Sequence, residues 1–269
     1  MGGPAGRLAG QGVVVTGAGR GIGRALALRA AAEGARVVVN DLDADNARAV
    51  AAEVGGTAVP GDASSAEGVT ALVDAASEAL GRIDVYFANA GIDGGGGPQS
   101  LQTPDDVWAR VVDVNVMAHV RAARALVPRW LDDGQGGRFV VTASAAGLLT
   151  MIGSAPYSVT KHAAVGFAEW LSVTYGARGI DVHAICPQGV RTAMLESAGP
   201  LKDLLSRDGA LEPEDVADAA MTAIEEGRFL VLPHPEIGTY YVARATDTDR
   251  WLAGMQRLQT KLDESGAFG

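Results

Sequence analysis

Short runs of β-branched and aromatic residues recur along the chain, and stretches with helical periodicity lie between them. The runs fall at residues 12–16, 36–40, 84–89, 138–142 and 180–185. Runs of this length bounded by glycine or polar residues are typical of buried strands. Strand–helix alternation at this spacing predicts a parallel sheet that helices cover on both faces. We therefore expect one α/β domain, with a Rossmann-type, doubly wound sheet.

Local sequence signals indicate where several of the helices begin. Ser64 and Glu67 form a candidate capping box in front of a periodic apolar stretch. Thr103 and Pro104 are placed to open a long helix, with the threonine as its cap and the proline in its first turn. A further helix is expected over 157–175. No linker or change of composition divides the chain, so we expect a single domain over 8–269, after a flexible N-terminus at 1–7.

Composition and charge narrow the classes of partner. The chain has 269 residues, of which 48% are hydrophobic, and 22 basic against 32 acidic residues give a net charge of −10. This charge repels phosphate backbones and anionic lipid, so we expect no nucleic-acid and no membrane partner. Cys186 is the single cysteine, which favours a reducing, cytoplasmic setting. We expect no metal site, because no metal-ligand spacing relates the four histidines, His119, His162, His183 and His234.

A glycine-rich segment joins the first predicted strand to the first predicted helix. Its sequence, TGAGRGIG at 16–23, allows a tight turn and a close approach to a pyrophosphate at the helix N-terminus. Asp41 follows the second strand, 18 residues after Gly23. A carboxylate there can accept hydrogen bonds from the adenosine ribose and would repel a 2′-phosphate at ~4 Å by about 4 kcal/mol. This favours NAD, although Arg20 could pair with such a phosphate, so NADP stays open as the less favoured dinucleotide.

Tyr157 and Lys161 are four residues apart, which places them on one helix face. The ordinary tyrosine pKa is near 10, so a tyrosine that acts as a base at neutral pH needs a cation beside it. Lys161, with the charge of a nicotinamide ring, could lower the Tyr157 pKa in this way. Ser144 directly follows a predicted strand and could bind a substrate oxygen. Taken alone, a Tyr–Lys pair at this spacing is common and usually inert.

As a set, these segments resemble the short-chain dehydrogenase/reductase family from about Leu8 to Phe229. The resemblance implies catalytic roles for Asn115, Ser144, Tyr157 and Lys161, with Asn115 kinking its helix and holding a water of a proton relay. It also implies a set of cofactor-binding residues: Gly17, Arg20, Gly21, Ile22, Gly23, Asp41, Leu42, Asp62, Ala63, Asn89, Ala90, Gly91, Tyr157, Lys161, Pro187, Gly189, Val190 and Thr192.

Two features of the chain bear on the substrate. Gln188 stands where the family usually has glycine after the sixth strand, which adds an amide beside the substrate cavity. Apolar residues recur in the two segments that the resemblance places around that cavity: Leu148, Leu149, Met151 and Ile152 in the first, and Met194, Leu195, Leu201, Leu204 and Leu205 in a lid over 190–212. An apolar alcohol or ketone is the small-molecule substrate that these segments favour.

Residues 239–262 are expected to form a C-terminal helical extension. Trp251, Met255, Leu258 and Leu262 recur there at helical spacing, and such a stripe either caps the core or contacts another subunit. Because the family usually forms tetramers, we favour the subunit interface and expect a homo-oligomer, a tetramer or a dimer.

The sequence thus predicts an NAD(H)-dependent oxidoreductase that interconverts a secondary alcohol and a ketone. Two alternatives remain: an NADPH-dependent ketoreductase, suggested by Arg20, and a non-catalytic dinucleotide-binding sensor or scaffold. The sensor would be expected to have lost Ser144, Tyr157 or Lys161, and all three are present.

Overall fold

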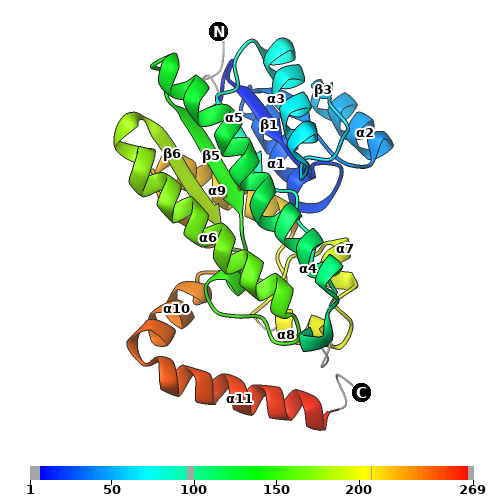
Figure 1. The fold of residues 1–269 in the computed structure, drawn as a ribbon, viewed down its shortest axis with the longest axis vertical. Coiled ribbons are helices and arrows are strands. Elements are labelled where there is room, and N and C mark those ends of the chain that lie inside the picture. The colour runs from blue at the N-terminus through cyan, green and yellow to red at the C-terminus, as the bar shows by residue number, and fades with distance from the viewer. Residues whose placement is uncertain (1–6, 96–99, 207, 266–269) are drawn as a thin grey trace.

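The computed structural model describes residues 7–95, 100–206 and 208–265, and their strands form one parallel sheet (Figure 1). The sheet has seven strands in the order β3-β2-β1-β4-β5-β6-β7. The bounds are Gly12–Val15 for β1, Arg36–Val39 for β2, Thr57–Ala58 for β3, Val85–Ala88 for β4, Gly137–Thr142 for β5, Ile180–Ile185 for β6 and Leu230–Val231 for β7. This confirms the doubly wound α/β prediction.

The strand order reverses beside β1, which is the point that positions the site. From β1 the chain moves outward to β2 and β3, and it then crosses back to place β4 on the other side of β1. In open parallel sheets, ligands bind at the carboxyl ends of the strands where such a reversal leaves a crevice. The carboxyl ends of β1 and β4 are therefore the place to look for the site.

Helices cover both faces because the strand residues point alternately to each face. In β1, Val14 packs into one buried cluster while Val13 and Val15 pack into the other. The first cluster lies under α3 (Ala66–Leu80), α5 (Ala118–Asp132) and α6 (Ala155–Tyr175), and Figure 1 shows these three helices on one side of the sheet. The second lies under α1 (Gly21–Ala32), α2 (Ala44–Val54) and α9 (Pro213–Glu225).

Two predicted helix starts are wrong by one residue. Ser65, not Ser64, caps α3, and its hydroxyl accepts a hydrogen bond from the backbone N–H of Gly68 at 2.9 Å. Ser64 instead donates to the carboxylate of Asp62 at 2.5 Å, so its hydroxyl is already in use. Pro104 takes the cap position of α4 (Asp105–Val112) that was expected for Thr103, whose hydroxyl donates back to the carbonyl of Ser100 at 2.8 Å.

The predicted long helix after residue 104 is not uniform. Between α4 and α5 a π-helical segment, η2 (Asp113–Met117), interrupts the α winding. Asn115 lies in this segment, where the family resemblance implied a kink. Insertions of this kind are frequent at functional sites.

Short helices complete the chain around the carboxyl edge of the sheet. They are η1 (Ser100–Gln102), η3 (Ala145–Gly147), α7 (Ala193–Glu196), η5 (Gly199–Leu201) and α8 (Lys202–Leu205). A further short helix, η4 (Gly176–Arg178), precedes β6 at the opposite, amino edge. The C-terminal segment forms two helices, α10 (Glu236–Thr246) and α11 (Thr248–Glu264), which lie below the sheet in Figure 1. They are separate because the Asp247 side chain caps α11 by accepting from the N–H of Arg250 at 2.9 Å.

Most of the expected flexible N-terminus, residues 1–6, lies outside the described residues. Arg7 is tied down, since its N–H donates to Glu33 at 2.8 Å and its guanidinium pairs with Glu225 at 3.1 Å.

Candidate active site

The glycine loop lies between the end of β1 and the start of α1, as predicted. Gly17 and Gly21 have φ values of +61° and +54°, which side-chain-bearing residues rarely adopt. A Cβ on Gly23 would lie 2.2 Å from the carbonyl oxygen of Gly17, so the helix can approach the loop this closely only with glycine there. The loop is a narrow backbone cradle at a helix N-terminus, which fits a pyrophosphate.

The segment after β4 packs against this loop and hydrogen-bonds to it. The side-chain amide of Asn89 donates to the carbonyl of Thr16 at 2.9 Å, and the N–H of Ala90 donates to the Thr16 hydroxyl at 3.1 Å. A Cβ on Gly17 would lie 2.9 Å from the Cα of Ala90. Contacts from Asn89 and Ala90 therefore fix the position of the loop at the sheet reversal.

Asp41 and Arg20 both lie beside the loop. One Asp41 carboxylate oxygen accepts from the N–H of Gly19 at 2.8 Å, and the other accepts from the N–H of Asp43 at 3.0 Å. Arg20 is exposed, and its side chain makes no hydrogen bond or ion pair with the residues that the structure describes. Leu42, also predicted to contact the cofactor, is 67% exposed. The loop thus carries an exposed arginine, Arg20, and donates a hydrogen bond to the Asp41 carboxylate.

Asp62 follows β3 at the same edge of the sheet, next to the buried Ala63. Its carboxylate accepts from the N–H of Ser64 at 2.9 Å and lies 3.5 Å from the Arg110 guanidinium. Burial pushes the pKa of Asp62 upward, but the Ser64 hydrogen bonds and the Arg110 charge outweigh burial and hold that pKa below its ordinary value. Asp62 is therefore a carboxylate at neutral pH.

Asn115 is fully buried and uses its whole side chain to hold the segment after β4. Its amide nitrogen donates to the carbonyl of Ile92 at 2.8 Å and lies 3.1 Å from the Thr160 hydroxyl, while its oxygen accepts from the N–H of Ile92 at 2.9 Å. A Cβ on Gly91 would lie 3.3 Å from both the Asn115 amide oxygen and the Lys161 ammonium. Glycine at position 91 thus leaves room for both groups beside the backbone.

Lys161 and Tyr157 come together on α6, beside the end of β5. The Lys161 ammonium donates to the carbonyl of Thr142 at 2.9 Å and lies 5.6 Å from the centre of the Tyr157 ring. Lys161 is only 3% exposed, and burial lowers its pKa to about 8. Ser144, just after β5, lies close enough to Tyr157 to act on the pKa of its phenol. The three predicted catalytic groups, Ser144, Tyr157 and Lys161, therefore occupy one site.

Lys161 was expected to lower the Tyr157 pKa together with the charge of a nicotinamide ring, and the protein's own groups do not lower this pKa by themselves. Burial raises the pKa of Tyr157 above its ordinary value, the nearby Asp93 and Cys186 raise it further, and Ser144 is the influence that lowers it. The Lys161 ammonium bonds the Thr142 carbonyl instead of the phenol. From the protein's own groups, Tyr157 is a protonated phenol at neutral pH, ready to donate.

The segment after β6, Pro187 to Thr192, closes the site on its other side. The Pro187 carbonyl accepts from the N–H of Ala145 at 2.8 Å and from the Ser144 hydroxyl at 3.5 Å. A Cβ on Gly189 would lie 2.4 Å from the carbonyl of Leu205, and one on Gly21 would lie 3.1 Å from the Thr192 methyl group. The segment therefore connects the glycine loop with the Ser144 side of the site. Val190, in the same segment, is buried and pairs with Leu211.

Two histidines that the sequence did not assign to the site lie next to it. His234 accepts from the N–H of Gln188 at 3.2 Å, and its other ring nitrogen lies 3.1 Å from the carbonyl of Gly209. His119 is buried one turn after Asn115, and its Nε2 atom has no hydrogen-bond partner among the described residues. Burial and the Lys161 charge lower the pKa of His119 to about 3. Neither the position of His234 nor that of His119 beside the site can be inferred from local sequence spacing.

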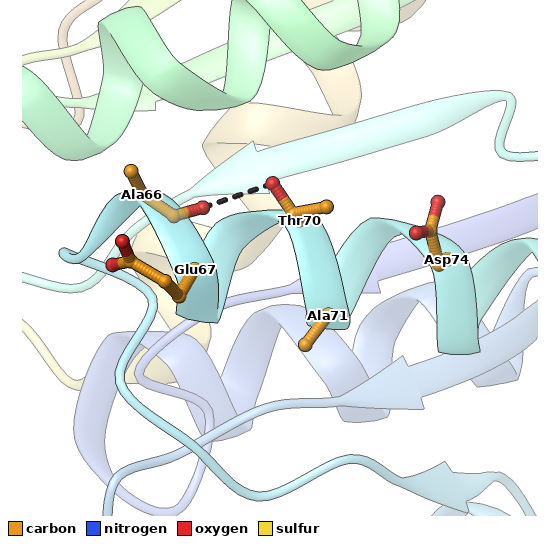
Figure 2. Close-up of a pocket in the computed structure, with 5 residues that line it drawn as sticks. All are labelled: Ala66, Glu67, Thr70, Ala71 and Asp74. Atoms are coloured by element: carbon orange, nitrogen blue, oxygen red, sulfur yellow. Dashed lines mark hydrogen bonds between the residues drawn. The ribbon is translucent and has the colours of Figure 1, made fainter.

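A surface depression on α3 lies outside this constellation. Figure 2 shows it lined by Ala66, Glu67, Thr70, Ala71 and Asp74, all on α3 and none among the predicted site residues. In the described part of the chain, no three His, Cys, Asp or Glu side chains gather as a metal site would require. None of the described helices is long and apolar enough to cross a membrane.

A parallel sheet whose order reverses beside a glycine cradle, with a serine, a tyrosine and a lysine at the same edge, defines an oxidoreductase of the Rossmann type. The chain belongs to the short chain dehydrogenase family, whose sequence model matches residues 11–202. It is therefore an enzyme of a family that uses a nicotinamide dinucleotide.

Among curated proteins, the chain is 35% identical over 245 residues to 1-deoxy-11-beta-hydroxypentalenate dehydrogenase from Streptomyces avermitilis, covering 89% of this chain and 90% of that one. It is 32% identical over 250 residues to short chain aldehyde dehydrogenase 1 from Euphorbia lathyris, covering 83% and 85%.

Among solved structures, one similar protein is a short chain dehydrogenase/reductase from Burkholderia phymatum in complex with NAD. The TM-score is 0.83 with 30% identity, covering 90% of this chain and 95% of that one. Another is a 7 alpha-hydroxysteroid dehydrogenase complexed with NADH and 7-oxo glycochenodeoxycholic acid. Its TM-score is 0.74 with 28% identity, covering 86% and 95%.

Proposed function

We propose that this protein is an NAD(H)-dependent oxidoreductase that interconverts a secondary alcohol and its ketone on an apolar substrate. The observation that carries the proposal is the Ser144, Tyr157 and Lys161 group, which lies at the same sheet edge as the glycine cradle. When bound, the dinucleotide supplies or accepts the hydride. The protein's own residues bind both molecules and move the proton.

Each catalytic group has one task in this proposal. During reduction the Tyr157 phenol donates its proton to the carbonyl oxygen and becomes a phenolate, and during oxidation the phenolate takes the hydroxyl proton and becomes a phenol. The protein's own groups favour the phenol, so oxidation requires the positive charge of the bound nicotinamide ring beside Lys161 to favour the phenolate. The Ser144 hydroxyl, which lies beside the phenol, orients the substrate oxygen. Lys161 holds a positive charge near the ring, and Asn115 keeps the segment after β4 in place at the inner end of a proton relay.

The cofactor-binding residues of the proposal are those of the cradle and its surroundings. Gly17 to Gly23 would hold the pyrophosphate, Asp41 and Leu42 the adenosine ribose, and Asp62 and Ala63 the adenine. Asn89 to Gly91 would support the middle of the dinucleotide. Pro187, Gly189, Val190 and Thr192 would hold the carboxamide of the nicotinamide, with Tyr157 and Lys161 beside its ribose.

NAD is favoured over NADP because the Asp41 carboxylate lies 2.8 Å from the Gly19 N–H, at the ribose end of the cradle. Arg20 favours the second candidate, an NADPH-dependent ketoreductase, because it is exposed and without a partner among the described residues. Titration of the protein with NADH and NADPH, side by side, decides between them. We expect NADPH to bind at least about tenfold more weakly, since a 2′-phosphate would meet Asp41. Tighter NADPH binding would reverse the assignment.

An apolar substrate is favoured by the segments on either side of Tyr157. Leu149, Met151 and Ile152 precede it, and Met194, 39% exposed, lies on α7 in the segment 190–212 that we propose as a lid. The names of two similar proteins, a hydroxypentalenate dehydrogenase and a hydroxysteroid dehydrogenase, also denote polycyclic alcohols. The test is a panel of secondary alcohols with NAD, followed by NADH absorbance. Cyclic and long-chain alcohols should be oxidised faster than ethanol or hydroxy acids, and no turnover of any of them would refute the proposal.

We further propose a cytoplasmic homo-oligomer, a tetramer or a dimer. Support comes from apolar side chains that the single chain leaves uncovered. Trp170 and Val173 on α6 are 54% and 85% exposed, and the stripe from Trp251 to Leu262 on α11 is only half-buried. Light scattering of the purified protein tests this proposal, and a monomer at micromolar concentration would refute it.

A further inference from the structure

The loop that connects Ser144 to the helix of Tyr157 and Lys161 has an unusual backbone conformation. It runs from Ala145 to Ser154, so that Ser144 precedes it and Tyr157 follows it closely. Thr150, near its middle, has a φ of +96°, the one positive φ at a non-glycine position in the described ranges. A β-branched residue is especially unfavourable in this region, so surrounding contacts must hold it there.

Contacts on both sides of Thr150 provide this restraint. On the C-terminal side, the Ser158 hydroxyl accepts from the N–H of Met151 at 2.9 Å and donates to the carbonyl of the same residue at 3.1 Å. On the N-terminal side, the carbonyl of Leu148 accepts from the guanidinium of Arg244. Leu148 itself is 2% exposed. Thr150 thus lies between two residues, Leu148 and Met151, whose backbone groups are hydrogen-bonded to side chains from elsewhere in the fold.

Arg244 comes from α10, almost a hundred residues away, and it also contacts the catalytic helix. Its guanidinium lies 3.1 Å from the Nε2 atom of His162, the residue after Lys161. The other ring nitrogen of His162 lies 2.8 Å from the carbonyl of Ser158 and so must carry the ring proton. Nε2 is then free to accept from Arg244. Arg244 therefore ties α10 both to the loop and to α6.

We propose that Arg244 is a positioning residue, through which the C-terminal segment holds the loop 145–154 in the conformation that receives the substrate. The inference rests on the proposed function, because it takes this loop as one wall of the substrate cavity. Arg244 touches no reacting atom. Its role is to keep the strained backbone at Thr150 from relaxing, so that the apolar side chains of the loop stay in place for the substrate.

Arg244→Ala, compared with Arg250→Ala, tests the proposal by steady-state kinetics. Arg250 is an exposed arginine on the neighbouring helix and provides the same change of charge. Loss of a hydrogen bond from a charged donor predicts a rise of about tenfold or more in KM for the alcohol, with NADH affinity unchanged. Arg250→Ala should keep the wild-type KM. An unchanged KM in Arg244→Ala, or an equal loss of NADH affinity, would overturn the proposal.

A second variant tests the role of strain. Glycine accepts a positive φ, so Thr150→Gly should lower the KM of the Arg244→Ala protein back toward the wild-type value. A general loss of folding would not be rescued in this way. If Thr150→Gly in that background leaves KM unchanged or raises it, strain at Thr150 is not what Arg244 opposes.

Hydrogen exchange of the peptide covering 145–154 gives a readout that needs no turnover. We expect faster exchange in Arg244→Ala than in wild type or Arg250→Ala. If the wild-type protein oxidises no alcohol, the proposed function fails while this measurement still stands. If exchange is the same in all three proteins, the restraint by Arg244 is refuted whatever the substrate is.

Discussion

Replacing Lys161 with methionine removes a buried ammonium group from the active site, and we expect the variant to be more stable than the wild-type protein. Lys161 is 3% exposed, and burial lowers its pKa from 10.5 to about 8. A depression of this size corresponds to about 3 kcal/mol of lost stability at neutral pH. Loss of the hydrogen bond to the Thr142 carbonyl offsets about 1 kcal/mol. The net gain in unfolding free energy should be about 2 kcal/mol.

The pH dependence of the stability difference shows whether the buried ammonium group causes it. Because the folded-state pKa is below the unfolded value, the unfolded chain binds more protons between pH 8 and 10.5, and wild-type stability rises with pH in that window. Methionine has no such titration. The advantage of Lys161→Met should therefore be complete below pH 8 and disappear toward pH 10.5.

Urea unfolding of both proteins at neutral pH and near the upper end of this window measures the effect, together with turnover at neutral pH. Turnover should be lost in the variant that gains stability. Lys202→Met is the control, because Lys202 is 44% exposed in an ion pair with Glu196, and its loss should change stability by less than about 1 kcal/mol. A Lys161→Met protein that is less stable than wild type, or equally stabilised at both pH values, would refute the reasoning.

Two further substitutions test the supports of the site. Asn115→Ala should lower the unfolding free energy by about 3 kcal/mol and reduce turnover, because the buried amide makes hydrogen bonds of 2.8–3.1 Å that alanine cannot replace. Urea unfolding measures the stability and NADH absorbance measures the turnover. Unchanged stability would contradict the assigned contacts. Gly23→Ala should weaken NADH binding by at least about tenfold, because its Cβ would lie 2.2 Å from the Gly17 carbonyl. Fluorescence titration checks this, and Gly166→Ala, whose Cβ would meet nothing within 4 Å, should bind NADH normally.

The central strands could be predicted from the sequence because parallel strands buried on both faces are nearly continuous apolar runs. The run 180–185 coincides with β6. The edge strands β3 and β7 have two residues each and leave no such run. Helix starts were harder to predict from the sequence. Ser64 and Ser65 are adjacent and each has a hydroxyl group, so only the backbone conformation decides which one caps α3.

The residues of the candidate site could be proposed because they lie at strand ends and one helical turn apart, and these relations are local. The supporting contacts are not local. His234 reaches Gln188 across 46 positions, and Arg244 reaches Leu148 across 96. For a related reason, the protein's own groups do not lower the Tyr157 pKa, and the expectation that Lys161 lowers it together with a nicotinamide charge stays a prediction. Charge proximity can be inferred from spacing, but the burial that raises the Tyr157 pKa depends on the whole fold.

The most direct test of the account is Tyr157→Phe, assayed for alcohol oxidation with NAD and for NADH binding. Phenylalanine keeps the ring beside Lys161 and removes only the hydroxyl that is proposed to carry the proton. The account predicts NADH affinity close to wild type and turnover reduced to less than a few per cent. Turnover near the wild-type rate would contradict the assignment of Tyr157 as the group that exchanges the proton with the substrate.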